Sequence, residues 1–393
     1  MRIAFITPEY VTESNFDGGL ANYLGRTCPA LVAMGHEVTV IVATDTTGMS
    51  VHDGVEVHRV QVTAKILHWL NRLTLWRLCA VNRWLLQSWL LNRLCKKLHR
   101  NRPFDVIHYT SYSATAFFKV KGVPAVVRLS SFNPLMRKYY ERPMNISARL
   151  EDWLEVQSIA KADDVFGPSH IIADHVGQGL NKNIHIIESP FCKKTIPDDD
   201  HVFSDLLHGK KYVLFFGSIG VLKGVDTIAA VLEPLLARNS DLYVVFAGKD
   251  LGYRGRPMMD HVWTCAGAHR GRVLYLGKMP HAFLDPLISN ANLVVLPSRI
   301  DNFPNTCLEA MSCERVVIGT RGASFEQLID DGVNGFLCEI DAPENLLEVM
   351  QKAIDLPPES RKKMGEQAAK RIDTLRPETV VRELVDFYQT VIN

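Results

Sequence analysis

The chain has 393 residues, more than one ordinary domain needs, and its 47% apolar and 22% charged residues are typical of a folded globular protein. A net charge of +1 and the lack of any long uninterrupted apolar run exclude the usual signatures of a nucleic-acid-binding protein and of a membrane span. The eight cysteines form no CxxC pair and no metal-ligand spacing, and no signal peptide precedes the first strand. We therefore expect a cytoplasmic protein without a metal site.

Strand and helix patterns alternate along the chain in two series. Short apolar strands separated by helices predict parallel sheets that are covered on both faces. We expect an α/β fold of two Rossmann-like, doubly wound domains, residues 1–192 and 193–376, facing each other across a cleft. The predicted strands are 2–7, 37–43, 57–62, 105–108, 124–129 and 164–167 in the first series, and 211–216, 241–247, 273–276, 293–296 and 316–319 in the second.

The loop before the first predicted helix contains Gly18 and Gly19. Glycines let the backbone approach a phosphate or a sugar closely, and the N-terminus of the following helix favours an anion. A tight turn without a ligand is the alternative. Asp17 beside this loop is either a turn residue or a group that orients an acceptor.

The segment 64–102 has an unusual composition. No Asp or Glu occurs between Gln61 and Pro103, and four of the six tryptophans of the chain lie there. At 100° per residue, its basic residues fall largely on one side of a helix and its leucines on the other. Such a helix suits an anionic membrane surface, and the alternative is a helical hairpin packed on the first domain. The basic residues are Lys65, Arg72, Arg77, Arg83, Arg93, Lys96, Lys97, Arg100 and Arg102, and the tryptophans are Trp69, Trp76, Trp84 and Trp89.

Two carboxylates, Asp301 and Glu309, frame a loop that leads into a helix. They follow the apolar run 292–298, so they belong at the carboxyl end of a strand, where ligands bind in open α/β sheets. An acid there would repel a phosphate and accept hydrogen bonds from sugar hydroxyls instead. The alternative is a helix N-terminus with favourably placed negative charges.

Further short motifs follow one another in a fixed order. Together with the acid pair, this ordered set resembles the retaining glycosyltransferases of family 4, which have the GT-B fold, along nearly the whole chain. The motifs are Gly35–Val40, Phe104–His108, Ala162–Ser169, Phe216–Ser218, Lys223–Asp226, Ala247–Gly248, Gly277, Pro297–Ser298, Gly322 with Glu326, and Asp331–Gly335.

The resemblance implies transfer of a sugar from a nucleotide-diphosphate sugar to an acceptor hydroxyl, with retention of anomeric configuration and without a metal cofactor. Lys223 would supply charge to the leaving diphosphate, Asp301 would contact the transferred sugar and Glu309 the ribose. A solvated lysine at a helix start is the alternative for Lys223. The remaining implied donor-binding residues are Gly217, Ser218, Asn302, Phe303, Asn305 and Thr306, and the implied acceptor or phosphate loop comprises Gly18, Gly19 and Ser130.

The same resemblance implies that residues 1–192 bind the acceptor, that residues 193–376 bind the donor, and that a C-terminal helix, 377–393, packs back on the first domain. It also suggests a role in cell-surface polysaccharide or glycolipid synthesis. The acceptor would be a sugar or a lipid-linked sugar, and the site of action the inner face of the membrane. For Glu326 two interpretations remain, contact with donor hydroxyls or capping of its own helix.

Three positions depart from the family pattern. Asp301 stands where the family usually has Glu, Ser218 where it has an arginine, and Ser130 where it often has a histidine. Lys249 or Arg254 is the expected substitute for the arginine, and Arg128 or His108 for the histidine. The departures leave open a non-catalytic nucleotide-sugar-binding homologue or partner subunit. A nucleotide-sugar epimerase also remains, whereas a nicotinamide oxidoreductase is disfavoured because neither glycine loop completes GxGxxG.

Overall fold

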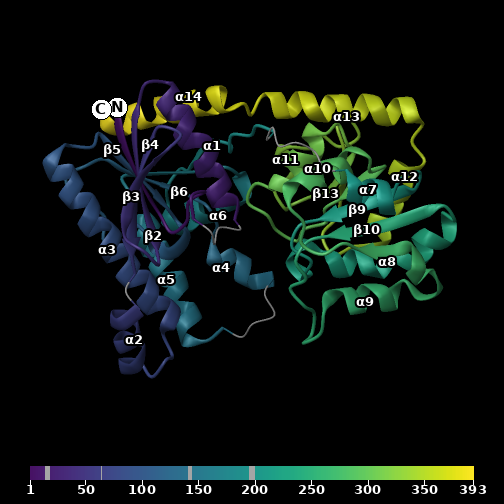
Figure 1. Ribbon diagram of the computed structural model, residues 1–393, viewed down its shortest axis with the longest axis horizontal. Helices are drawn as coiled ribbons and strands as arrows, with labels where there is room; N and C mark the ends of the chain where they lie inside the picture. The colour runs from purple at the N-terminus through teal and green to yellow at the C-terminus, as the bar shows by residue number, and fades with distance from the viewer. Residues whose placement is uncertain (14–17, 63, 140–143, 194–199) are drawn as a thin grey trace. The chain divides into compact units, whose positions relative to one another are not determined.

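The computed structural model describes residues 1–13, 18–62, 64–139, 144–193 and 200–393 (Figure 1). It divides into two compact units. The N-terminal unit comprises Met1–Cys192 together with Leu375–Asn393, and the C-terminal unit comprises Lys193–Thr374.

The N-terminal unit contains a sheet of eight described strands in the order β3-β4-β2-β1-β5-β6-β7-β8. All pairs are parallel except β3 with β4. The central strand β1 is apolar and almost wholly buried, as expected for a parallel strand covered on both faces. The strands are β1 (Arg2–Thr7), β2 (Glu37–Thr44), β3 (Gly48–His52), β4 (Val55–Gln61), β5 (Val106–Thr110), β6 (Ala125–Arg128), β7 (Asp164–Gly167) and β8 (His185–Ile186).

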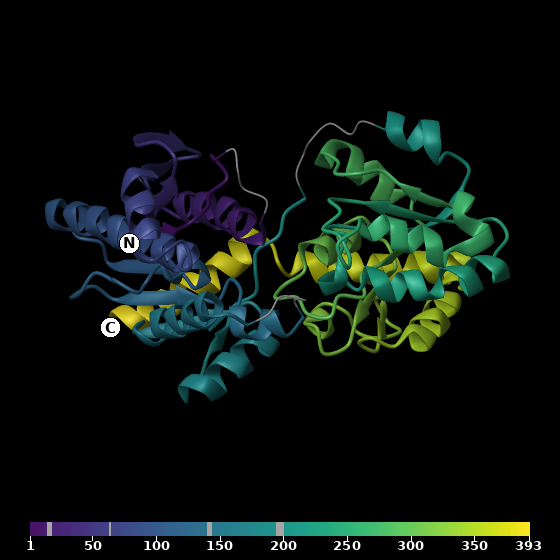
Figure 2. The ribbon, with the colours of Figure 1, turned by 90° about the horizontal axis from the view of Figure 1, so that it is seen from below.

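Helices of the N-terminal unit pack in pairs, α1 against α14 and α3 against α5. Figures 1 and 2 show α14, at the C-terminal end of the chain, lying along the same unit as the N-terminus. The helices are α1 (Gly19–Ala33), α2 (Ala64–Leu73), α3 (Cys79–Asn101), α4 (Asn133–Met136), α5 (Ile146–Ala160), α6 (His170–Leu180) and α14 (Pro377–Ile392), with 3-10 turns at Tyr112–Ala114 and Arg137–Tyr139.

Helix α14 starts with a proline in its first turn and buries an apolar face that includes Val381 and Leu384. The buried Tyr388 hydroxyl lies 2.5 Å from Nδ1 of His108 in β5, and the two are hydrogen-bonded. Burial, with the nearby charge of Arg128, lowers the pKa of His108 well below its usual value, so its ring is neutral. The suggestion that His108 offers a polar contact to a ligand is wrong, because this side chain is fully buried.

The segment 64–102 does not form one continuous amphipathic helix, which is how its side chains were placed at 100° per residue. The backbone turns at Leu75 and Trp76, which have φ of 48° and 60°, and separates α2 from α3. Across the turn, Asn82 Nδ2 donates to Asn71 Oδ1 at 3.0 Å and to Thr74 Oγ1 at 2.9 Å. The side-by-side helices of the hairpin alternative are what the structure shows. A buried amide network at the turn overrides the continuous helical periodicity.

A buried acid in the N-terminal unit makes stability depend on pH. Burial raises the pKa of Glu155 to about 8, opposed by a hydrogen bond that its Oε2 accepts from Asn133 N at 2.8 Å. The folded state therefore holds a proton that the unfolded chain releases above about pH 4.5. The contribution of Glu155 to the free energy of unfolding is fully present below that pH. It falls by about 1.4 kcal/mol per pH unit as the pH rises to about 8.

We expect Glu155→Gln to remove this dependence, because glutamine keeps the acceptor for Asn133 and carries no charge. Urea unfolding at pH 5, 7 and 9 should show a free-energy difference between variant and wild type that grows in favour of the variant with pH. Parallel pH profiles of the two proteins would contradict the buried proton at Glu155.

The C-terminal unit contains a parallel sheet of six described strands in the order β11-β10-β9-β12-β13-β14. Three short strands of the fold, β3, β8 and β14, lie outside the predicted ones. The strands are β9 (Lys211–Phe216), β10 (Leu242–Ala247), β11 (Val273–Tyr275), β12 (Leu293–Val295), β13 (Val317–Thr320) and β14 (Phe336–Cys338). The helices are α7 (His201–Leu206), α8 (Val225–Arg238), α9 (Met258–Cys265), α10 (His281–Ser289), α11 (Asn305–Ser312), α12 (Pro343–Ile354) and α13 (Pro358–Asp373), with 3-10 turns at Val221–Lys223, Gly267–Arg272 and Phe325–Gln327.

Within the described ranges, no helix combines the length and apolar character needed to cross a membrane. The same residues contain no group of three or more His, Cys, Asp or Glu side chains arranged to hold a metal ion.

Candidate functional site

Two loops meet at the carboxyl edge of the C-terminal sheet, one after β9 and one after the neighbouring β12. Gly224 ends the first loop in the left-handed region, with φ of 67°. A Cβ at this position would lie 1.9 Å from the carbonyl oxygen of Pro297 in the second loop. Only glycine permits this approach, and it brings the chain before α8 against the chain before α11.

This approach joins Lys223 and Asp301, the two residues to which the sequence assigns the chemistry. Lys223 Nζ donates to Asp301 Oδ2 in an ion pair. Asp301 Oδ1 accepts from Asn302 N at 3.0 Å, and the Asp301 carbonyl accepts from Ser324 Oγ at 2.8 Å. With 28% of the Lys223 side chain and 17% of the Asp301 side chain exposed, the pair remains accessible to a ligand. An entering diphosphate would compete with Asp301 for the lysine charge.

Arg299 holds the lysine loop in place, and the sequence did not single it out. Its guanidinium donates to both Asp226 carboxylate oxygens at 2.8 Å, and its Nε lies 2.5 Å from Asp341 Oδ1. Its backbone N donates to Leu222 O at 3.0 Å, and Nη1 donates to the Val221 carbonyl. Burial, the largest single effect, lowers the pKa of Arg299, but the hydrogen bonds and charges of Asp226 and Asp341 together outweigh it, so the net shift of the pKa is upward.

The glycine turn after β9 lies beside the start of α11. The Cβ position of Gly217 is 3.5 Å from Thr306 Cγ2, and a Cβ on Gly248 would meet Gly217 O at 1.7 Å. Ser218 is exposed on this turn. Ile219 N donates to Lys249 O at 2.9 Å, so the exposed Lys249 lies on the strand-like segment next to Ser218. Arg254 instead stacks on Tyr253, with its guanidinium 5.0 Å from the ring centroid.

Helix α11 begins at Asn305 after the cap residue Pro304, and Glu309 lies half-buried one turn into it. Asn302 and Phe303 are buried, with 8% and 7% of their surface exposed. A ligand at this edge would therefore meet Phe303 mainly through its backbone. Of the sequence-predicted residues, Lys223 and Asp301 are in direct contact and Gly217 lies beside Thr306. Glu309 lies on the same helix as Thr306.

Comparison with known families agrees with this geometry. The family model described as glycosyl transferases group 1 matches residues 198–371, and the one described as a glycosyl transferase 4-like domain matches residues 18–187. The chain belongs to the group 1 glycosyltransferases of the family 4 type.

Individual relatives are distant in sequence. This glycosyltransferase is 26% identical over 304 residues to the α-D-kanosaminyltransferase of Streptomyces kanamyceticus, covering 72% of the chain and 75% of the relative. It is 27% identical over 159 residues to the 2-deoxystreptamine N-acetyl-D-glucosaminyltransferase of Niallia circulans, covering 40% of the chain and 38% of the relative.

Solved structures establish the fold as GT-B. Sucrose-phosphate synthase from Thermosynechococcus elongatus matches with a TM-score of 0.77 at 16% identity, covering 99% of this chain and 98% of that one. Anabaena HepE in complex with UDP-glucose matches with a TM-score of 0.70 at 17% identity, covering 99% and 100%. At these identities the likeness concerns the fold alone.

Glu326 of this glycosyltransferase accepts a hydrogen bond from Gly322 N. Of the two interpretations left open for Glu326, this contact favours the local one, in which the carboxylate closes its own turn.

In the N-terminal unit, Gly18 caps α1 and lies against Glu9. A Cβ on Gly18 would be 2.7 Å from Glu9 Oε1, which accepts from Ala21 N at 3.2 Å. A carboxylate of the glycosyltransferase itself thus lies at the helix end where the sequence predicts an external anion beside Gly18 and Gly19. Asp17 falls outside the described residues.

Ser130 follows β6, and its backbone N donates to Ser111 Oγ at 3.0 Å. Arg128, expected as a substitute for the family histidine, is buried and lies 3.7 Å over the ring of Tyr23. Its Nη2 donates to Ser189 Oγ at 2.8 Å and its Nη1 to Ser130 Oγ at 3.4 Å. These contacts tie Arg128 to the core of the unit, so it reaches a ligand at most through Ser130.

Proposed function

We propose that this chain transfers a sugar from a nucleotide-diphosphate sugar to an acceptor hydroxyl with retention of anomeric configuration, in cell-surface polysaccharide or glycolipid synthesis in the cytoplasm. The observation that carries the proposal is the Lys223–Asp301 pair at the carboxyl edge of the C-terminal sheet, next to the helix that bears Glu309. We assign the donor to the C-terminal unit and the acceptor to the N-terminal unit.

In the transfer, the bond between the anomeric carbon and the diphosphate oxygen breaks. A new bond forms from that carbon to the acceptor oxygen on the same face, and the acceptor proton passes to the departing diphosphate. Lys223, with Lys249 in place of the family arginine, stabilises the negative charge that develops on the diphosphate. Asp301 is engaged with Lys223 and serves to position the sugar, and Glu309 accepts from the ribose hydroxyls. Because lysines supply this charge, we propose that no metal ion is needed.

Two structural relatives support a nucleotide-sugar donor, and the names of the sequence relatives indicate the kinds of sugar and acceptor. One structural relative was solved with UDP-glucose and another with UDP-2-fluoro glucose. Several sequence relatives are named as transferases of amino sugars or as acting on D-inositol 3-phosphate. The donor base and sugar are therefore best found by a screen.

The first test is a thermal-shift screen against nucleoside diphosphates and their sugars, since a ligand that binds the folded state raises the unfolding midpoint. Glu309→Ala should weaken the shift, and Glu359→Ala, on an exposed position of α13, should not. If Glu309→Ala responds like wild type, the ribose assignment is wrong.

The second test measures nucleoside diphosphate release from the donor that the screen identifies. Release that requires an acceptor and persists in EDTA supports metal-free transfer, and NMR of the product gives the anomeric configuration. Release or rearrangement without acceptor would indicate hydrolysis or epimerisation. Donor binding without any turnover would indicate the non-catalytic homologue.

We further propose that the glycosyltransferase rests on an anionic membrane through a surface that we call the apolar tip, formed by α2 and the turn after it. Its side chains are between 45% and 72% exposed, namely Ile66, Trp69, Leu73, Leu75 and Trp76. The basic residues Lys65, Arg72 and Arg77 beside them are also exposed. Exposed tryptophans and leucines with basic neighbours and no acid suit the interface of an anionic bilayer.

Co-sedimentation with phosphatidylcholine vesicles, with and without phosphatidylglycerol, checks this surface. We expect binding only with the anionic lipid, and a loss of about tenfold or more in Trp69→Ser/Leu75→Ser because two exposed apolar anchors are removed. Trp153→Ser, at a tryptophan on α5 that is 52% exposed, is the matched control and should bind like wild type. Equal pellets for all three proteins would contradict the assignment.

A further inference from the structure

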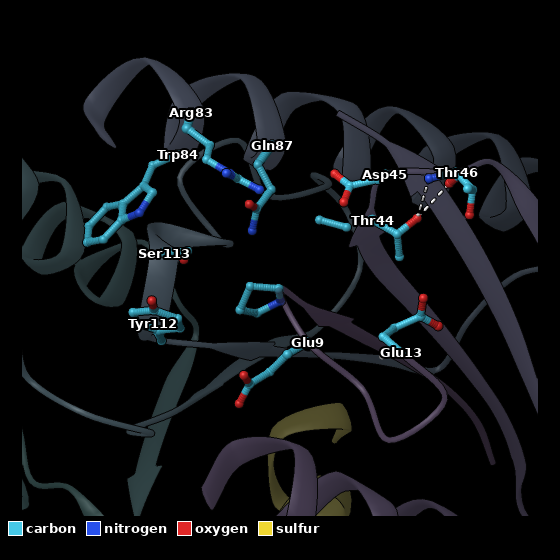
Figure 3. A pocket seen from close by; sticks show the side chains of 12 residues that line it. Glu9, Glu13, Thr44, Asp45, Thr46, Arg83, Trp84, Gln87, Tyr112 and Ser113 are labelled. Atoms are coloured by element: carbon cyan, nitrogen blue, oxygen red, sulfur yellow. Dashed lines mark hydrogen bonds between the residues drawn. The ribbon is translucent and has the colours of Figure 1, made fainter. Parts of the chain in front are cut away.

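A cavity lies wholly within the N-terminal unit, at the carboxyl ends of β1, β2 and the segment after β5, under helix α3 (Figure 3). Its volume is about 460 Å³, within the range of small-molecule sites. It adjoins the point in the strand order where the chain moves from one side of β1 to the other, which is where open α/β sheets bind ligands. Its lining is mostly polar.

One buried donor in this cavity lacks a partner. Gln87 of α3 is only 5% exposed, and its Nε2 makes no hydrogen bond with any described residue. Figure 3 shows its amide pointing into the cavity. Buried polar groups of folded proteins are almost always hydrogen-bonded, so an oxygen of a bound molecule would complete this one. Ser113, on the cavity wall, has φ of 64°, a strained backbone of the kind found at ligand sites.

The charges of the cavity identify the kind of molecule. Three carboxylates, Glu9, Glu13 and Asp45, line it against one guanidinium, Arg83. Arg59, outside the lining, neutralises Glu13 in an ion pair of 2.8 Å. Glu9 and Asp45 remain against Arg83, so the net charge of the lining is negative. A phosphate or a carboxylate would be repelled here, whereas an ammonium group would be attracted.

Two aromatic rings complete the cavity. Trp84 and Tyr112 lie with centroids 6.2 Å apart at 73°, and they form an apolar corner on the side of the cavity across from Asp45 (Figure 3). Trp84 is 9% exposed and packs in an apolar cluster, so Tyr112, 41% exposed, presents the accessible ring. Aromatic faces attract cations and also pack against the C–H faces of ring compounds. Carboxylates, hydroxyl-bearing side chains and an aromatic corner together fit a polyhydroxylated ring that carries an amine.

We propose that this cavity binds the acceptor of the transferase as an amine-bearing polyol ring. Gln87 Nε2 donates to a ring hydroxyl, Asp45 faces the ammonium group, and Tyr112 packs against the ring. The role of this ring as the acceptor rests on the proposed function. Binding of the ring to the cavity does not, because it involves residues of the N-terminal unit alone.

The test is ligand-observed NMR titration of the full chain, without nucleotide, by glucosamine, glucose and glucose 6-phosphate. The three probes share one ring and differ in charge. We expect glucosamine to bind about tenfold or more tightly than glucose 6-phosphate, with glucose between them. Equal affinities, no binding by any probe, or tightest binding of the phosphate would overturn the proposal.

Two variants locate the binding. Asp45→Asn should reduce the ratio of the affinity for glucosamine to the affinity for glucose. Gln87→Leu should lower the affinity for both sugars by the same factor. The controls are Asp174→Asn on α6 and Gln157→Leu on α5, and unchanged unfolding midpoints show that each variant is folded. If Asp45→Asn and Gln87→Leu bind like their controls, the cavity is not the site. If the chain binds glucosamine selectively but binds no nucleotide, the result supports the proposed binding site and contradicts the proposed transferase function.

Discussion

Replacing Lys223 with methionine is expected to lower kcat for sugar transfer by about 10²–10³-fold, the usual effect of removing one group that stabilises charge in a transition state. Methionine keeps most of the length of the side chain and removes the charge that would meet the leaving diphosphate. Stability should change by less than about 1 kcal/mol, because the Lys223–Asp301 pair is partly exposed and solvent screens it. Steady-state release of nucleoside diphosphate measures the rate.

Lys363→Met is the matched control for this variant, because Lys363 is an exposed lysine of α13 in the same unit. It should keep the wild-type rate. A Lys223→Met enzyme whose kcat stays within twofold of wild type would show that Lys223 does not act on the leaving group, and Lys249 would then be the residue to examine.

Replacing Arg299 with alanine is expected to lower the free energy of unfolding by about 3 kcal/mol. The reason is that Asp226 and Asp341 lose their shared partner, and Asp226, with 18% of its side chain exposed, is left largely desolvated. The Val221 carbonyl also loses its contact with the side chain, while the backbone hydrogen bond from residue 299 to the Leu222 carbonyl remains, so the loop before Lys223 is held less firmly. We therefore expect the rate of transfer to fall along with stability. Urea unfolding and the release assay measure the two effects.

Arg299→Lys separates the charge from the geometry. Lysine keeps a positive charge but cannot donate to both Asp226 oxygens as the planar guanidinium does. We expect a variant that is more stable than Arg299→Ala and still slower than wild type. Arg238→Ala, at an exposed end of the same helix as Asp226, should change stability by less than about 0.5 kcal/mol. If Arg299→Lys transfers sugar at the wild-type rate, the forked contact does not position Lys223.

Most strands of the fold can be predicted from the sequence, because parallel strands that are buried on both faces are continuous apolar runs. The predicted strands at 2–7, 164–167 and 211–216 coincide with β1, β7 and β9. Short edge strands are different. β3 has exposed Met49 and Val51, and β8 has only two residues, so neither presents a buried run long enough to recognise.

The helix break at Leu75 and Trp76 shows a second limit. Leucine and tryptophan continue an amphipathic pattern, and neither residue favours a positive φ. The turn exists because Asn71, Thr74 and Asn82 form a network across it, and that network appears only after the two helices have met.

By itself, the sequence determined the fold class, the family, and the chemical types present at the donor edge: a lysine after a glycine turn and an acid on either side of a helix start. The tertiary structure alone decided which of these groups touch. Lys223 and Asp301 are 78 positions apart, and so are Arg299 and the Val221 carbonyl. Their pairing follows from the adjacency of β9 and β12 and from the close approach at Gly224, which no local pattern encodes. The amide nitrogen of Gln87, which has no hydrogen-bond partner among the described residues, likewise shows itself only in the structure, because burial and hydrogen bonding are properties of the folded chain.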